Sequence, residues 1–114
     1  MEQIEELKSS YYEYVNKIAD GCQMIAKLIR KGEYEQAFNA VVDFAEGIEW
    51  LLTVEKSLEG QGQQINSRLN EANDFLLEIN TAFEQQDIVT IADLFEYEIQ
   101  PLFSSASEWI FKEQ

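Results

Sequence analysis

Carboxylates are the side chains in this sequence that could most readily do chemistry. Glu96 and Glu98 flank one predicted helix stripe, one on each side, and Asp43 and Glu46 lie on the outer face of another predicted helix. Converging carboxylates can hold a divalent cation or act as an acid–base pair. These positions are also typical of boundary residues that reach solvent beside a core. We therefore predict no catalytic residues, no metal site and no cofactor.

Most other kinds of catalytic site are excluded by what the sequence lacks. It has no histidine, so Ser-His-Asp triads, Cys-His pairs and the Glu-x-x-His ligands of di-iron bundles cannot form within it. The segment Gly60-Gln61-Gly62 lacks the downstream lysine of a phosphate-binding loop. Cys22 lies in an apolar stripe, where a buried and inert thiol is expected. We therefore expect a protein that is not an enzyme.

The 114-residue chain carries a net charge of −14, and its acids are concentrated in two blocks. Residues 32–55 contain six acids and no base, and residues 69–111 contain nine acids and no base. Nucleic acid and anionic membrane surfaces are bound by clustered Lys and Arg, so both are disfavoured as partners. Acidic faces of this kind either serve solubility alone or favour a basic or weakly charged protein partner.

Several features predict a cytoplasmic location. The single cysteine excludes an internal disulfide, which favours a reducing compartment. The first residues have neither the basic region nor the apolar run of a signal peptide. No stretch approaches the roughly 20 apolar residues that cross a bilayer.

Four apolar stripes with three- and four-residue spacing predict helices over about residues 4–30, 33–58, 63–86 and 88–111. Gly32 follows a basic last turn, as a C′ glycine does, and Asp87 is placed as an N-cap. Short connections make neighbouring helices antiparallel, so we predict one all-α domain, an up-down-up-down four-helix bundle without a sheet. Pro101 interrupts the last stripe and predicts a kink, or a break into two helices, near residues 98–101.

The second predicted helix has more apolar surface than a single bundle core would use. Trp50 points roughly opposite Val41 of the main stripe, and Leu58 widens the apolar band. A surface helix normally buries one face, so either loops and termini of this chain or a partner must cover the remainder. Trp and Tyr are common anchors at protein interfaces. We predict that the partner-binding residues are Gly47, Trp50, Leu51, Val54, Leu94 and Tyr97.

The order of turns and apolar runs between Ala19 and Trp109 resembles that of a known family. The features are Asp20-Gly21 opening an apolar run, the turn Arg30-Lys31-Gly32-Glu33-Tyr34-Glu35, a long helix with Ala45, Ile48, Leu51 and Leu52, the loop Gly60–Gly62, a helix through Leu69 and Leu76, the turn Gln85-Gln86-Asp87-Ile88, and a helix ending at Glu108-Trp109. In this order the chain resembles the flagellin-export chaperones, small helical-bundle proteins of bacteria. It is also similar to small uncharacterised helical proteins of Gram-positive bacteria.

The first resemblance implies a cytosolic bundle that clasps an apolar helical segment of an export substrate until delivery. It carries no residue-level binding motif, so it implies no site residues. Pro101 and the early start of the first helix depart from it.

We therefore expect a non-enzymatic interaction module, a chaperone or adaptor that binds an apolar helical segment of a partner protein. A structural homodimer would use the same surplus of apolar surface and is the first alternative. A metal protein using carboxylates alone is the second.

Overall fold

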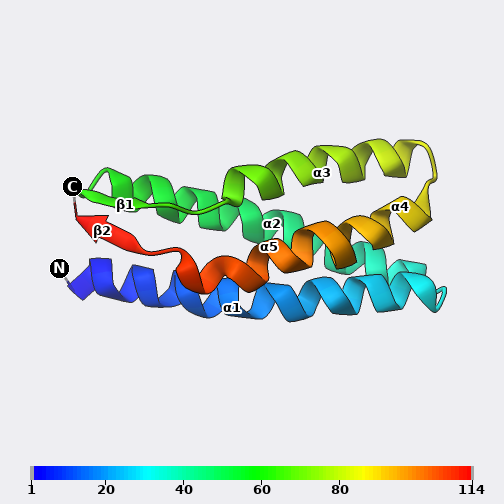
Figure 1. Ribbon diagram of the computed structural model, residues 1–114, viewed down its shortest axis with the longest axis horizontal. Coiled ribbons are helices and arrows are strands. Elements are labelled where there is room, and N and C mark those ends of the chain that lie inside the picture. The colour runs from blue at the N-terminus through cyan, green and yellow to red at the C-terminus, as the bar shows by residue number, and fades with distance from the viewer. Residues whose placement is uncertain (1, 114) are drawn as a thin grey trace.

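Four antiparallel helical segments lie side by side along the 46 Å long axis of the molecule (Figure 1). The computed structural model describes residues 2–113. The segments are, in order, α1 (Glu2–Arg30), α2 (Tyr34–Glu59), α3 (Leu69–Glu84), and a composite fourth made of α4 (Ile88–Asp93), the π-helix η1 (Leu94–Ile99), α5 (Gln100–Ser104) and the 3-10 helix η2 (Ser105–Glu108). This arrangement confirms the predicted all-α, up-down-up-down bundle.

Two tight turns reverse the chain at the same end of the bundle. Gly32 adopts the left-handed conformation (φ 82°), and the next amide, of Glu33, donates to the carbonyl of Leu28 at 2.9 Å. Gln86 plays the corresponding part after α3 (φ 57°). Asp87 then caps α4 by accepting from the Thr90 amide at 3.2 Å and the Thr90 hydroxyl at 2.6 Å. The C′ glycine and the N-cap aspartate were both predicted correctly.

The fourth segment accommodates Pro101 by changing from an α-helix to a π-helix over the preceding turn. Proline has no amide hydrogen to donate, so a regular α-helix would lose a hydrogen bond there. The turn preceding Pro101 is π-helical, and the Gln100 amide reaches back five residues to the carbonyl of Phe95. Pro101 then lies in the first turn of α5, where proline is tolerated. The irregularity expected near residues 98–101 thus takes the form of a π-helical turn.

A short two-stranded ribbon replaces helix at the other end of the bundle, so the prediction of no sheet was wrong. β1 (Gln63–Ile65) pairs antiparallel with β2 (Phe111–Glu113), with Gln63 opposite Glu113. The third helix accordingly begins at Leu69 instead of residue 63, and the last helical turn ends at Glu108 instead of residue 111.

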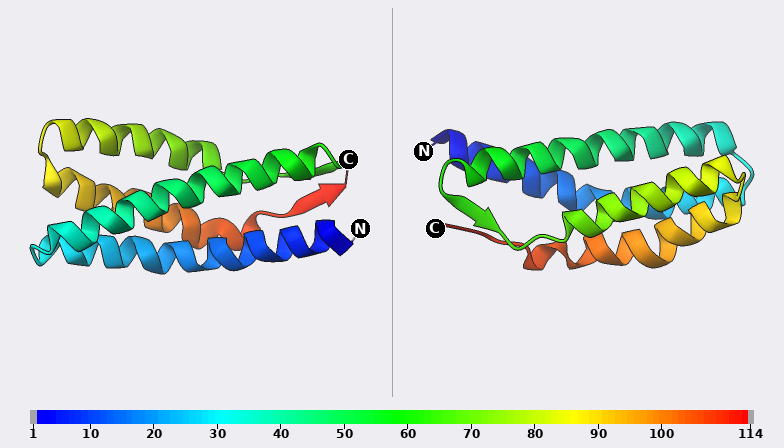
Figure 2. Two further views of the ribbon diagram at one scale, coloured as in Figure 1. Left: turned by 180° about the vertical axis from the view of Figure 1, so that it is seen from behind. Right: turned by 90° about the horizontal axis from the view of Figure 1, so that it is seen from above.

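The ribbon forms because α1 and α2 are longer than the two helical segments that cover them. Figure 2 shows β1 and β2 lying over the far ends of α1 and α2, beyond the start of α3. An extended chain advances about 3.3 Å per residue, more than twice the rise of a helix, so a few residues close this gap. Phe111 is buried there against the rings of Tyr11 and Tyr12, with centroids 5.1 and 5.9 Å away.

One apolar core runs the length of the bundle. The ring of Phe44 packs edge-on against Phe95 at 5.2 Å, and Phe103 packs against Trp109 at 5.7 Å. Within residues 2–113, no helix is both long and apolar enough to span a membrane.

Candidate docking groove

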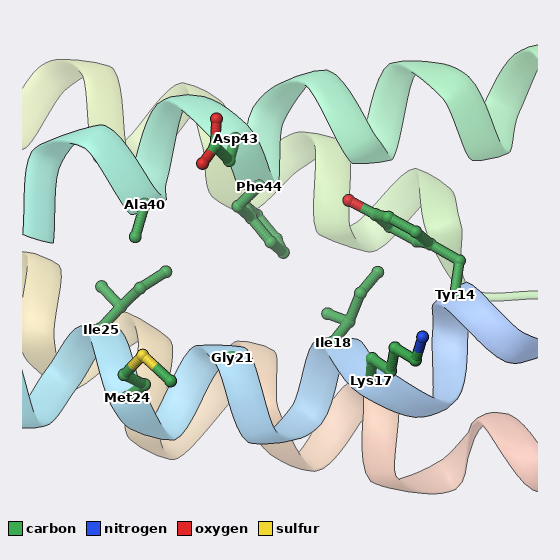
Figure 3. A pocket seen from close by; sticks show the side chains of 9 residues that line it. All are labelled: Tyr14, Lys17, Ile18, Gly21, Met24, Ile25, Ala40, Asp43 and Phe44. Atoms are coloured by element: carbon green, nitrogen blue, oxygen red, sulfur yellow. The ribbon is translucent and has the colours of Figure 1, made fainter.

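A groove follows the outer seam between α1 and α2. It contains two adjoining hollows, and the first, of about 220 Å³, is lined by residues of both helices (Figure 3). The lining residues are Tyr14, Lys17, Ile18, Gly21, Met24 and Ile25 from α1 and Ala40, Asp43 and Phe44 from α2. In α1 they recur every three or four residues, as positions on one helix face do.

The hollow exists because small residues stand where the two helices face each other. In Figure 3, Ile18 and Ile25 extend from α1 toward α2, and the ribbon of α1 is bare at Gly21 between them. A Cβ added at Gly21 would meet no atom within 4 Å. Across the seam, Ala40 contributes a single methyl group. Met24 lies at the mouth and is 59% exposed. The packing of this chain therefore leaves the space at Gly21 unused.

An aromatic pair closes one end of the hollow and extends the groove. The rings of Tyr14 and Trp50 pack with centroids 5.6 Å apart. The Tyr14 hydroxyl lies directly over Gly47, where a Cβ would collide with it. A second hollow lined by Ser10, Glu13, Tyr14, Lys17 and Trp50 continues the groove past this pair.

The rim of the groove is mainly acidic at the Trp50 end. Burial raises the pKa of the Tyr14 hydroxyl, and the nearby carboxylates of Asp43 and Glu46 raise it further. Glu13 stands on the opposite wall, and Lys17 is the one cation among the lining residues of the two hollows. Ion pairs within residues 2–113 join Lys8 to Glu5, Arg30 to Asp93 and Glu96, and Arg68 to Glu71. Glu13, Asp43 and Glu46 take part in none of these ion pairs.

Four of the six predicted partner-binding residues lie inside the molecule. Gly47, Leu51, Val54 and Leu94 are buried, with Leu51 fully enclosed. Gly47, Leu51 and Val54 were expected on an exposed face because α2 was assigned a single core side, and Leu94 was expected there because it lies off the main stripe of the fourth segment. In the folded chain α2 contacts α1, α3 and β1, and its buried arc is correspondingly wide. We remove these four residues from the candidate surface.

The other two predicted residues are exposed but lie far apart. Trp50 is 39% exposed and Tyr97 is 65% exposed. Trp50 packs beside Tyr14, whereas Tyr97 lies near Arg30 at the other end of α1. At about 1.5 Å per residue, those two positions on α1 are about 24 Å apart. Trp50 belongs to the groove and Tyr97 does not.

Sequence reasoning missed Gly21 and Ala40, which shape the hollow. Two series of positions, each with three- and four-residue spacing, could have indicated them. These are 14, 17, 21 and 24 on the first helix and 40, 43, 47 and 50 on the second, antiparallel helix. Each series contains a glycine, and each contains an exposed large apolar residue, Met24 or Trp50. Reading the two series together would have located the seam.

The remaining reactive groups serve structure. The Tyr11 hydroxyl donates to Glu55 Oε2 at 2.6 Å, and the Ser67 hydroxyl donates to the same oxygen at 2.7 Å. This network ties α1 and α2 to the segment between β1 and α3. Burial raises the pKa of the Cys22 thiol to about 12, so the sulfur stays protonated and unreactive.

The four carboxylates singled out in the sequence lie in two different surroundings. Glu96 is paired with Arg30 instead of Glu98. Asp43 and Glu46 belong to the groove rim. Across the described residues, no three Cys, Asp or Glu side chains gather in a way that could hold a metal ion.

Comparison with known proteins places the chain in a family without assigning it an activity. No curated protein and no solved structure matches it. A family match covers residues 6–108, nearly all of the sequence. The chain belongs to the family described as "Domain of unknown function (DUF8042)".

Proposed function

We propose that the protein is a non-enzymatic protein-binding module whose α1–α2 groove receives an apolar helical segment of a partner protein. The observation that carries this proposal is the unused hollow at Gly21, which the exposed side chain of Met24 lines and which adjoins a second hollow lined by the exposed side chain of Trp50.

The length of the groove suits a helix. From Ser10 to Ile25 its lining residues follow α1 for about 22 Å, or about four helical turns. Its two adjoining hollows, of about 220 and 330 Å³, lie one after the other along the seam. Such a row of hollows suits successive apolar side chains on one face of a bound helix.

The choice of glycine at position 21 also supports an occupant. Glycine in the middle of a helix costs about 0.5–1 kcal/mol relative to alanine. At position 47 the cost is offset because the absence of a side chain makes room for Tyr14. At position 21 no group of this chain occupies the corresponding space. A partner side chain seated at Gly21 would give the residue a packing role.

The narrower role in flagellar export rests on the sequence resemblance alone, and the family match adds nothing to it. We therefore keep the proposal at the level of helix binding. A second copy of the chain is a less suitable occupant, because two chains of net charge −14 repel each other.

NMR titration with designed peptides tests the proposal. Three 18-residue helical peptides share one leucine face and carry Lys, Gln or Glu at all other positions. We expect at least one of them to shift the amide signals of residues 14–24 and 40–50 saturably. Gly21→Leu fills the hollow and should weaken that binding at least tenfold.

Asn73→Leu is the matched control, because it adds the same side chain to an exposed position of α3. It should bind like the unmodified protein. The proposal is overturned if none of the peptides shifts the groove signals, or if Gly21→Leu binds as tightly as Asn73→Leu.

A further inference from the structure

We infer that the helix received by the groove is basic, with Lys or Arg side chains that face Asp43 and Glu46 beside the apolar residue seated at Gly21. This inference rests on the proposed function and specifies the chemistry of the partner.

The first support is the placement of charge around the groove. Asp43 lines the main hollow, and Glu46 follows one turn later on the same face of α2. Both carboxylates act on the Tyr14 hydroxyl, which places them next to the aromatic end of the groove. Glu13 lines the adjoining hollow from α1, and Lys17 is the one cation among the residues that line the two hollows.

The second support is that none of these carboxylates forms an ion pair among the described residues. The side chains of Glu13, Asp43 and Glu46 are exposed, and every ion pair found among residues 2–113 lies elsewhere. A cation on a partner would meet carboxylates that need not first break a contact within the chain. Charges at such a rim select a partner and speed its approach more than they tighten the complex.

The charge is also uneven along the seam. Near the Gly32 turn, at the opposite end from Trp50, the exposed side chains of Lys27 and Lys31 are balanced by those of Glu33 and Glu35. The basic residues of the partner are therefore expected near the Trp50 end, and an apolar or neutral stretch near the other. This polarity distinguishes a seated helix from general attraction to an acidic protein.

The test uses the same three peptides and two double variants that remove equal charge. Asp43→Asn/Glu46→Gln neutralises the groove rim, and Asp74→Asn/Glu78→Gln neutralises two exposed carboxylates of α3. We expect the Lys peptide to bind the groove most tightly and the Glu peptide least. The rim variant should weaken the Lys peptide about fivefold and leave the Gln peptide unchanged, and the α3 variant should change either by less than twofold.

Three results would overturn the inference. The first is equal affinity of the three peptides for the groove. The second is an α3 variant that weakens binding of the Lys peptide as much as the rim variant does. Groove signals that shift with protein concentration alone would identify a second copy as the occupant. If the groove binds all three peptides equally well, the proposed function stands and only the inference about charge is overturned. If the groove binds none of the peptides, the proposed function and the inference are both overturned.

Discussion

Two tyrosines one turn apart on α1 stand in opposite surroundings. Tyr11 is fully buried, and its hydroxyl donates to Glu55, which also accepts from Ser67. Tyr14 is half-buried, and its hydroxyl lies near Asp43 and Glu46 without a hydrogen bond to either among the contacts described. At both positions a tyrosine of α1 lies near a carboxylate of α2. Tyr11 and Glu55 form a buried structural network, whereas Tyr14 with Asp43 and Glu46 forms part of an open rim.

The difference follows from what covers each position. Over Tyr11 the ribbon of β1 and β2 places Phe111 in ring contact and excludes water. Tyr14 packs against Trp50 and Gly47 of α2, and the two hollows that it lines stay open to solvent. The comparison indicates that Tyr11 contributes mainly to stability, whereas the surroundings of Tyr14 leave room for a partner.

The largest expected effect separates the two tyrosines directly. Tyr11→Ala removes a fully buried ring and should lower the free energy of unfolding by about 3–5 kcal/mol. Tyr14→Ala removes a partly exposed ring and should cost about 1–2 kcal/mol. Urea unfolding followed by circular dichroism measures both. Equal losses from the two variants would contradict the contrast between closed and open ends.

The next effect compares two glycines on the seam. Gly21→Ala should raise the free energy of unfolding by about 0.5–1 kcal/mol, because the new methyl meets open space and alanine favours the helix. Gly47→Ala gains the same helix propensity but drives its methyl into the Tyr14 hydroxyl, so we expect no net gain. Thermal unfolding compares the two, and a Gly47→Ala protein as stable as Gly21→Ala would show that Tyr14 does not rest on Gly47.

The smallest effect concerns the pH dependence of the Tyr11 network. Burial raises the pKa of Glu55 above its ordinary value of 4.5, so the folded protein holds this proton to higher pH than the unfolded chain does. The contribution of Glu55 to stability is therefore complete below pH 4.5 and is lost as the pH rises through the folded-state pKa.

Glu55→Gln removes this titration and can still accept from both hydroxyls through its amide oxygen. From pH 4.5 to 7, unfolding in urea should show the unmodified protein losing stability relative to Glu55→Gln. Glu78→Gln, exposed on α3, is the control for loss of one charge. Stability curves for the unmodified protein and Glu55→Gln that stay parallel over this range would refute the role given to burial.

The helical part of the fold was predictable because its signals are local. Apolar spacing within α1 placed Cys22 correctly inside, and Gly32 and Asp87 marked two turns, the first by its backbone conformation and the second by its capping side chain. The strands were not predictable in this way. Each has three residues, and each is formed by pairing with a partner distant in the sequence, so Ile65 was read as part of a helical stripe.

The groove was only partly predictable for a related reason. Helix periodicity indicated surplus apolar surface on α2, and it placed the side chain of Trp50 correctly outside the core. It did not show that α1 itself covers part of the surplus, because the burial of Gly47 depends on Tyr14 of the neighbouring helix. Predicting such a seam requires the pairing of two helices, which a single-helix pattern does not contain.

The central claim is that the hollow at Gly21 accepts a partner side chain, and the methyl group of Met24 reports on it directly. In protein labelled with ¹³C at its methionine methyls, the Lys peptide should give nuclear Overhauser contacts between its leucine methyls and Met24. Those contacts should disappear in Gly21→Leu and persist in Asn73→Leu. A bound Lys peptide that gives no contact to Met24 in the unmodified protein would contradict the account.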